Sequence, residues 1–162
     1  MTVLCILFGL HAIAGSVDTI EMKSAYLKKA VKFVIVQPSK QSQQNSIQER
    51  YPVVYLLNGY DGNYAQWSKT APQLAKTSDD LKIIFVCADG GKSSWYFDSP
   101  IDSTSQYESY ITKELVPYVD ANFSTRAKMG QSSDVYAVAI MADGRALFAK
   151  KEVKVTLGGC GG

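Results

Sequence analysis

The chain has 162 residues, of which 46% are hydrophobic and 20% are charged. These values are typical of a globular chain of about one domain, long enough to bury a core. The formal net charge is +2, and positive and negative residues are interspersed along the sequence. The charge pattern therefore indicates neither nucleic acid nor an anionic membrane as a partner.

The first residues are predicted to be a cleaved signal peptide. The stretch from Val3 to Ala14 is apolar apart from His11, and it ends in a small-x-small pattern. About a dozen apolar residues cannot span a bilayer, but they match the hydrophobic part of a signal peptide. We therefore expect residues 1–14 to be removed and the mature chain to be secreted or periplasmic. A buried N-terminal strand or helix is the alternative.

Cleavage at that point would leave little for redox or metal chemistry. It would remove Cys5 and the single histidine, so that Cys87 and Cys160 would be the two remaining cysteines. Cys87 lies in an apparent buried strand and Cys160 in a glycine tract, so we expect no disulfide between them. The sequence shows no metal-ligand spacing, and we predict no metal and no other cofactor.

The first half of the mature chain is predicted to form an α/β sheet. Four strands are expected, at Asp18–Ser24, Val31–Gln37, Val53–Leu57 and Ile83–Ala88. The first two alternate in the manner of an antiparallel pair, whereas the last two are continuous apolar runs that end in glycine-rich loops. A short helix over Tyr64–Lys76 separates those two runs, with Pro72 at a first turn or a kink. The order indicates a strand–helix–strand unit.

A longer helix is predicted from Ser103 to Phe123, because its apolar residues recur at three- and four-residue spacing. Ser105 or Thr104 could cap its start, and Glu108 is placed for a capping box with Ser105. Pro117 predicts a kink in the second half, or a separate terminal turn.

The loop from Asn58 to Asn63 follows the first buried strand and is a candidate site. Its glycines, Gly59 and Gly62, let the backbone turn tightly and present NH groups to a ligand. A simple tight turn is the alternative interpretation. Loops at the carboxyl ends of such strands are where α/β proteins place their sites.

Three ordered motifs resemble a known family. They read YPVVYLLNGYDGNYAQW from Tyr51, ADGGKSSWYFDSP from Ala88 and YITKELVPYVDANF from Tyr110. With them, residues 17–126 resemble the N-terminal half of the esterase D and feruloyl-esterase-like branch of the α/β hydrolases. The resemblance implies a truncated α/β-hydrolase-like sheet with flanking helices over residues 15–126, and a small ester as substrate.

The same resemblance implies roles for particular residues. The backbone NH of Tyr60, the residue after Gly59, would help to form an oxyanion hole. Trp95, Tyr96 and Asp98 would border the substrate pocket. Asn58 replaces the histidine that is usual in the family. The change is tolerable because a backbone NH, and not this side chain, would contact the oxyanion.

The catalytic elements of the family are not found. A hydrolase of this kind needs Gly-x-Ser-x-Gly, the turn that exposes its nucleophile, and the chain contains none. Ser132 and Ser133 lack the second glycine, and no histidine remains as a base after cleavage. The resemblance therefore implies descent from an esterase, with little or no activity.

The sequence pattern changes between Ala127 and Gly130, where the predicted α/β segment ends. Beyond it, Val135–Met141 and Leu147–Leu157 are predicted to pair as a β-hairpin around the turn residues Asp143 and Gly144. Cys160 then stands between two glycine pairs, which would give it a narrow, flexible arm. A disordered tail with an incidental thiol is the plain alternative.

The sequence SSDVYAVAIMADGRALFAKKEVKVTLGGCGG, from Ser132, resembles the C-terminal end of SoxY, the sulfur-carrier subunit of the bacterial thiosulfate-oxidising system. The resemblance implies that Cys160 carries a sulfur compound covalently and visits periplasmic sulfur-oxidising proteins. Its arm would consist of Gly158, Gly159, Gly161 and Gly162.

Two functions of different classes are therefore expected. Residues 15–126 suggest an esterase-family fragment, and residues 127–162 suggest a carrier that acts through Cys160. The junction near Ala127 indicates a natural fusion, an assembly artefact or an engineered chimera.

Overall fold

The computed structural model describes residues 15–39, 50–126, 133–140 and 146–153. The chain forms two compact units, Met1–Thr125 and Arg126–Gly162. The expected signal peptide, Ser132, the turn at Asp143 and Gly144, and the arm around Cys160 lie outside the described residues. Within the part of the chain that the structure describes, no helix is both long and apolar enough to cross a membrane.

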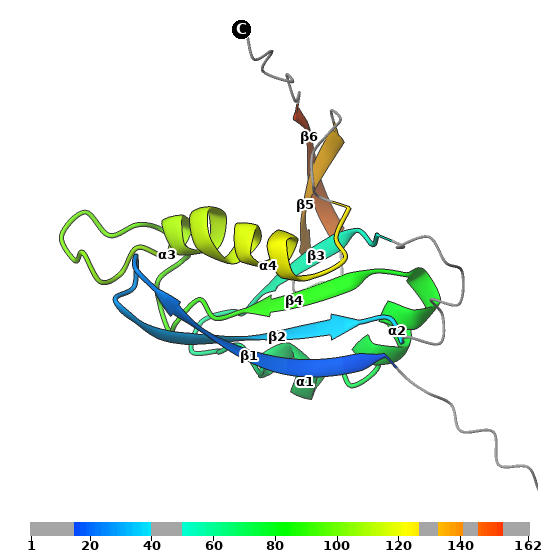
Figure 1. Ribbon diagram of the computed structural model, residues 1–162. Coiled ribbons are helices and arrows are strands. Elements are labelled where there is room, and N and C mark those ends of the chain that lie inside the picture. The colour runs from blue at the N-terminus through cyan, green and yellow to red at the C-terminus, as the bar shows by residue number, and fades with distance from the viewer. Residues whose placement is uncertain (1–14, 40–49, 127–132, 141–145, 154–162) are drawn as a thin grey trace, which may run out of the picture. The chain divides into compact units, whose positions relative to one another are not determined.

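The first unit is built on a four-stranded mixed sheet with the order β1-β2-β4-β3 (Figure 1). Its strands are β1 (Ser16–Ser24), β2 (Lys29–Gln37), β3 (Val53–Leu57) and β4 (Ile84–Ala88). β1 and β2 form an antiparallel hairpin, β2 pairs antiparallel with β4, and β3 pairs parallel with β4. The expected antiparallel pair and the strand–helix–strand unit are both confirmed.

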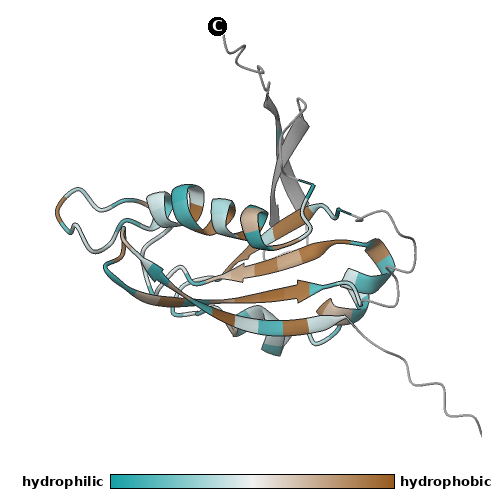
Figure 2. Cartoon of the chain, viewed as in Figure 1, coloured by the Kyte–Doolittle hydropathy of each residue, from teal (hydrophilic) through white to brown (hydrophobic). Residues whose placement is uncertain are grey.

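The sheet is covered on both faces, which explains why its central strands are continuous apolar runs. All five residues of β4 are buried, and the brown strands in Figure 2 mark this apolar centre. On one face Phe33, Ile35 and Val86 pack against the aromatic stripe of the long helix predicted at Ser103–Phe123. On the other face Val34, Val36 and Phe85 pack against Trp67 and neighbouring apolar residues.

The helix predicted at Tyr64–Lys76 is wrong in extent, because two helices occupy this part of the chain. They are α1 (Gln66–Thr70) and α2 (Leu74–Leu81), and Pro72 lies between them. The ring of a proline disfavours helical backbone in the residue before it, and Ala71 accordingly leaves the helical region with φ −128° and ψ 68°. Pro72 thus divides the segment instead of kinking it.

The long helix begins later than predicted, at Tyr107, and is not uniform. It runs as α3 (Tyr107–Ser109), a π-helix η2 (Tyr110–Leu115) and α4 (Val116–Asn122). Pro117 has no NH to bond back along an α-helix, and the wider turn lies just before it. Pro117 is thereby placed in the first turn of α4, where a missing NH costs little.

The start of this helix also differs from the predicted cap. No side chain of the local sequence caps α3, so neither Ser105, Thr104 nor a capping box with Glu108 forms. Thr104 instead donates both its NH and its hydroxyl to Asp102, at 2.8 and 2.7 Å. A backbone NH near the helix start, that of Ser109, instead donates to Asp98 in the loop that precedes the helix.

The second unit contains β5 (Ser133–Ile140) and β6 (Ala146–Val153). They pair antiparallel from Ser133 with Val153 to Ile140 with Ala146. The predicted strands are Val135–Met141 and Leu147–Leu157. Their inner ends differ from the observed ones by one residue each, and the first strand starts two residues earlier than predicted. The predicted end of the second strand lies beyond the described residues.

Glu114 ties the long helix to the turn between β1 and β2, and this contact gives a test of the fold. Its carboxylate accepts from the Ser24 hydroxyl at 2.5 Å and from the Ala25 NH at 2.8 Å. We expect Glu114→Ala to lower the free energy of unfolding by about 1–2 kcal/mol, since hydrogen bonds to a charged group are lost.

Both tryptophans lie in the first unit, so denaturant unfolding followed by tryptophan fluorescence reports on it directly. Glu108→Ala is the matched control, because Glu108 is exposed on the same helix and such substitutions change stability by less than about 0.5 kcal/mol. Equal effects of the two substitutions would show that Glu114 does not anchor the turn.

Candidate functional site

Two loops meet where the parallel strands β3 and β4 end. The first follows β3 and closes a turn in which the Gly62 NH donates to the Gly59 carbonyl at 3.1 Å. The second follows β4, and its Lys92 carbonyl accepts from the Asp61 NH at 2.8 Å. The Lys92 ammonium also lies 3.6 Å from the Asp61 carboxylate. These contacts hold the two loops side by side.

Asn58 is the centre of this arrangement. The residue is 6% exposed, and its side-chain oxygen accepts from the Gly90 NH at 2.8 Å and from the Tyr96 hydroxyl at 3.0 Å. Its side-chain amide donates to the Gly59 carbonyl at 2.9 Å and to the Gly91 carbonyl at 3.3 Å. Every polar atom of this buried side chain is therefore bonded, and its partners belong to both loops.

The role of Asn58 was missed in the sequence. The resemblance gave the Asn58 side chain no role, because the oxyanion contact was assigned to the backbone. In the structure this side chain joins the two loops. A polar residue placed directly after a buried strand is the signal that could have indicated it.

Trp95 and Tyr96 were predicted to border one pocket, but they face different surroundings. Both have left-handed backbone, with φ of 52° and 59°. The Trp95 side chain is exposed, whereas the Tyr96 hydroxyl reaches inward to the Asn58 carbonyl at 3.1 Å. Burial is the main cause that raises the pKa of Tyr96 to about 12. Tyr96 therefore serves as a link between the loops, and Trp95 remains free to meet a ligand.

Asp98 is turned toward the long helix. Its two carboxylate oxygens accept from the Ser109 NH at 2.9 Å and from the Ser109 hydroxyl at 2.6 Å. These bonds hold the pKa of Asp98 below its ordinary value. The bond from the Ser109 hydroxyl has the largest effect, and the bond from the Ser109 NH has the second largest. Asp98 thus supplies the helix start with the acceptor that the local sequence lacks, and its place at the substrate pocket stays a prediction.

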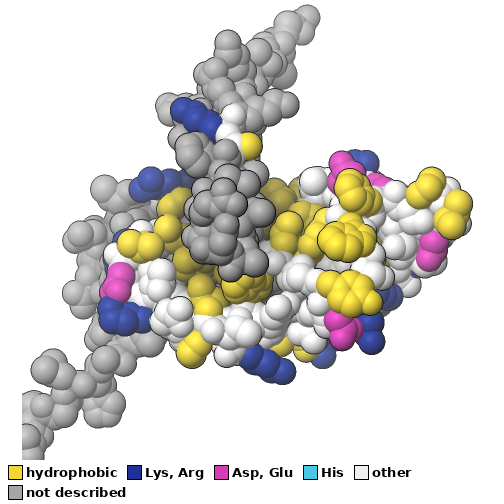
Figure 3. All heavy atoms as spheres, turned by 180° about the vertical axis from the view of Figure 1, so that it is seen from behind, with side chains coloured by type: hydrophobic (Ala, Val, Ile, Leu, Met, Phe, Trp, Pro, Cys, Tyr) yellow, Lys and Arg dark blue, Asp and Glu magenta, His cyan; other side chains and the backbone are white. Residues whose placement is uncertain are grey.

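The backbone after Gly59, predicted to help form an oxyanion hole, lies in the first of these loops. Among the described residues, the Tyr60 NH has no acceptor, and the Tyr60 side chain is 77% exposed. A methyl group at Gly59, the residue before it, would meet no atom within 4 Å. Tyr60, Trp95, Phe97 and Ile101 are large hydrophobic side chains that are exposed. Figure 3 shows exposed hydrophobic side chains toward the right of the view, with acidic side chains beside them.

The two serines considered as nucleophiles do not belong to the described part of the first unit. Ser133 is the first residue of β5, in the second unit, and Ser132 lies outside the described residues. Cys87 is fully buried in β4, and burial raises the pKa of its thiol to about 11. No group of three or more metal-binding side chains occurs among the residues described.

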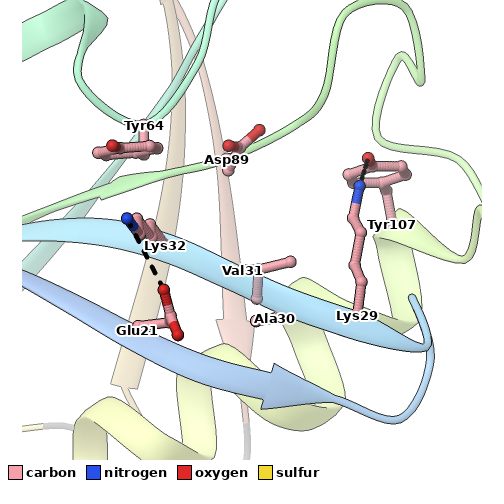
Figure 4. A pocket seen from close by; sticks show the side chains of 8 residues that line it. All are labelled: Glu21, Lys29, Ala30, Val31, Lys32, Tyr64, Asp89 and Tyr107. Carbon is pink, nitrogen blue, oxygen red and sulfur yellow. Dashed lines mark hydrogen bonds and ion pairs between the residues drawn. The ribbon is translucent and has the colours of Figure 1, made fainter.

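A pocket of about 230 Å³ lies over β1 and β2 and is also lined by Tyr64 and by Asp89, the first residue after β4 (Figure 4). Its walls hold two lysines and two carboxylates, so it has no net charge. Lys32 lies 3.7 Å from Glu21, and Lys29 donates to the Tyr107 hydroxyl at 3.2 Å. The lining is Glu21, Lys29, Ala30, Val31, Lys32, Tyr64, Asp89 and Tyr107. None of the predicted site residues contributes to it.

The mixed sheet, with helices on both faces and a site formed by loops at the ends of parallel strands, is an α/β architecture of the hydrolase type. Solved structures with this fold are esterases and related hydrolases. A ferulic acid esterase matches with a TM-score of 0.58 and 23% identity, over 74% of this chain and 48% of that chain. An S-formylglutathione hydrolase from Agrobacterium tumefaciens matches with a TM-score of 0.59 and 23% identity, over 70% and 46%.

Curated relatives agree with the structures. An endo-1,4-β-xylanase/feruloyl esterase of Xylanibacter ruminicola is 36% identical over 87 residues, which are 49% of this chain and 12% of that protein. An esterase of Mycobacterium tuberculosis is 34% identical over 83 residues, which are 48% of this chain and 18% of that protein. The chain spans less than a fifth of either relative. These likenesses support an esterase-family hydrolase and confirm the resemblance of the first unit.

The C-terminal part matches a different family. The model of the sulfur oxidation protein SoxY matches residues 105–160. The match begins upstream of the position near residue 130 where the sequence resemblance was placed, and it includes the long helix. It ends on Cys160.

The Asp98 anchor predicts a pH dependence of stability. A carboxylate whose pKa is lowered by folding stabilises the protein above its unfolded pKa of about 3.9, and this contribution is lost as the pH falls through the lowered value. Asp98→Asn should therefore reduce the melting temperature at pH 7, and the difference from wild type should shrink below about pH 4.

Thermal unfolding between pH 2 and pH 7 checks this prediction. Asp18→Asn, at an exposed position on β1, is the matched control and should change the melting temperature little at any pH. A difference at Asp98 that stays constant down to pH 2 would rule out the charged anchor.

Proposed function

We propose that residues 15–126 are an esterase-family α/β-hydrolase module that can bind an ester but has little or no hydrolytic activity by itself. The observation that carries the proposal is the Tyr60 NH in the loop after β3, which has no acceptor among the described residues, within a fold shared with esterases. A small ester is the substrate class that the esterase relatives suggest.

The geometry supports one step of ester hydrolysis. An ester carbonyl that approached the Tyr60 NH would gain a hydrogen-bond donor for the negative charge that develops on its oxygen. The bonds of Asn58 to both loops would keep that NH in place during the reaction. Trp95 and Tyr60 offer exposed aromatic surface against which the substrate could pack.

The remaining steps have no group to perform them. A serine hydroxyl attacks only when a base removes its proton, and the chain has no Gly-x-Ser-x-Gly turn and, without residues 1–14, no histidine. Oxyanion stabilisation alone gives a small residual rate.

This proposal predicts very slow turnover. The rate with p-nitrophenyl acetate should lie on the order of a million-fold below that of a complete serine esterase, because nucleophile and base are absent together. Ser133→Ala should leave the residual rate unchanged. Rapid hydrolysis that Ser133→Ala abolishes would contradict the proposal and identify Ser133 as a nucleophile.

The SoxY match gives a second candidate function. It includes Cys160 and ends on it, which supports a chain that carries a sulfur compound on this thiol and delivers it to sulfur-oxidising proteins. The glycine pairs on either side of Cys160 would let the thiol enter a narrow channel. Such a carrier would work in the periplasm, in agreement with the expected cleavage of residues 1–14.

A carrier role predicts that the two cysteines of the cleaved chain react very differently. Cys160 should react rapidly with a thiol reagent, whereas Cys87 should react far more slowly because it is buried and its pKa is raised. The fast reaction should disappear in Cys160→Ser and persist in Cys87→Ser. Mass spectrometry of the chain after exposure to thiosulfate under oxidising conditions should place an adduct on Cys160.

The same spectra show whether residues 1–14 are removed on export. If neither cysteine reacts until denaturant is added, or if no adduct forms on Cys160, the carrier function should be abandoned. A chain exported with Met1 still in place would contradict the expected cleavage.

A further inference from the structure

Asn58 and Gly59 form the single Asn-Gly pair of the chain. In such a pair the glycine nitrogen can attack the side-chain carbonyl carbon of the asparagine, because glycine has no Cβ to hinder the approach. The side-chain amide nitrogen leaves as ammonia, taking up the proton that the glycine nitrogen loses, and a succinimide ring forms. Water then opens the ring at either carbonyl and leaves aspartate or isoaspartate. Water is the one co-reactant, and nothing is oxidised or reduced.

The backbone at position 59 has no steric need for glycine. Gly59 is not among the described residues with positive φ, and a methyl group there would meet no atom within 4 Å. The Gly59 NH donates to no acceptor among the described residues. The nucleophile of the reaction is therefore not held by a hydrogen bond, and protection of the pair rests on the Asn58 side chain.

That side chain is held on every polar atom. Its oxygen accepts from the Gly90 NH and the Tyr96 hydroxyl, and its amide donates to the Gly59 and Gly91 carbonyls. The residue is also buried between the two loops. Rotation of the amide toward the Gly59 nitrogen would break these bonds, so the attack requires a state in which the two loops have opened.

We propose that Asn58 is a deamidation site that the closed loops protect, and that its modification then keeps the loops apart. A carboxylate at this position has no NH2 group for the Gly59 and Gly91 carbonyls, and it would set acceptor oxygens against them. Among the described residues no lysine or arginine bonds to this side chain, so a buried charge here would be uncompensated.

The second product, isoaspartate, would disturb the loop further. Its backbone runs through the side-chain carbons, which would displace the Tyr60 NH from its present place. Either product is formed irreversibly, so one opening that ends in deamidation removes the closed arrangement permanently. The inference rests on the two loops and does not depend on esterase activity.

Mass spectrometry of proteolytic peptides from the full chain tests the protection, because the change from amide to carboxylate alters the mass of the peptide that contains residue 58. The chain is incubated at mildly alkaline pH, either folded or in urea. Deamidation of Asn58 should be on the order of a hundredfold slower in the folded chain, because the bonds of its side chain must open first. Asn63 and Asn122 precede Tyr64 and Phe123, whose side chains hinder the attack, so both should stay largely intact in either sample.

Two variants separate the chemistry from the protection. Gly59→Ala should slow the reaction in urea, because its methyl group hinders the attacking nitrogen. Tyr96→Phe removes a bond to the Asn58 oxygen and should speed the reaction of the folded chain about fivefold, with no effect in urea. Tyr118→Phe, on α4, is the matched control and should change neither rate. Should Tyr96→Phe fail to fold, the comparison of the folded chain with the chain in urea still decides.

Amide exchange by NMR tests the effect of the modification on the loops. Asn58→Asp has the side chain of one product, and it should speed exchange of the Asp61 NH, whose acceptor is the Lys92 carbonyl in the other loop. Asn63→Asp adds the same charge to the same loop at an exposed position, and it should leave that exchange unchanged.

Three results would overturn the proposal. Equal rates of deamidation in the folded chain and in urea would show that the closed loops give no protection. A faster rate in the folded chain would show that the Gly90 NH and the Tyr96 hydroxyl activate the amide instead. Unchanged exchange of the Asp61 NH in Asn58→Asp would show that the modification leaves the loops together.

Discussion

The position of the whole candidate site depends on one buried amide. Asn58 ends β3, and its side chain accepts from the Gly90 NH and donates to the Gly91 carbonyl, both in the loop after β4. A buried amide left unpaired would cost about 1–3 kcal/mol, so the two loops are stable only in the arrangement that satisfies it. The open Tyr60 NH owes its place to this constraint, since it lies two residues beyond Asn58 on the same loop.

The constraint also explains the strained backbone nearby. Asp61, Trp95 and Tyr96 all have left-handed φ values, and each costs about 1–2 kcal/mol in a residue other than glycine. The bonds of Tyr96 to Asn58 and of Asp61 to Lys92 offset this cost. The strain has a structural consequence, because it turns Trp95 outward while Tyr96 points in. The site arranged in this way presents the Tyr60 NH, and no histidine occurs among the described residues.

The sheet could be predicted from the sequence because its strands are defined locally. Val53–Leu57 and Ile84–Ala88 are short apolar runs that end in glycine or polar loops, a pattern typical of buried strands. The helices were harder, because prolines decide their limits: Pro72 divides one helix, and Pro117 is accommodated by a π-helical turn. The particular partners of Asn58, Tyr96 and Asp98 could not be predicted, since each lies more than ten residues away in the chain; the place of Asn58 directly after a buried strand was the one local signal.

The central claim is that the Asn58 side chain, not the glycine beside it, holds the two loops together. Amide exchange by NMR in Asn58→Ala and Gly59→Ala tests it most directly. The account predicts that Asn58→Ala speeds exchange of the Gly90 NH, which loses its acceptor. Gly59→Ala should leave that exchange unchanged, since an added methyl group there meets no atom within 4 Å. Unchanged exchange at Gly90 in Asn58→Ala, or an equal increase in both variants, would contradict the account.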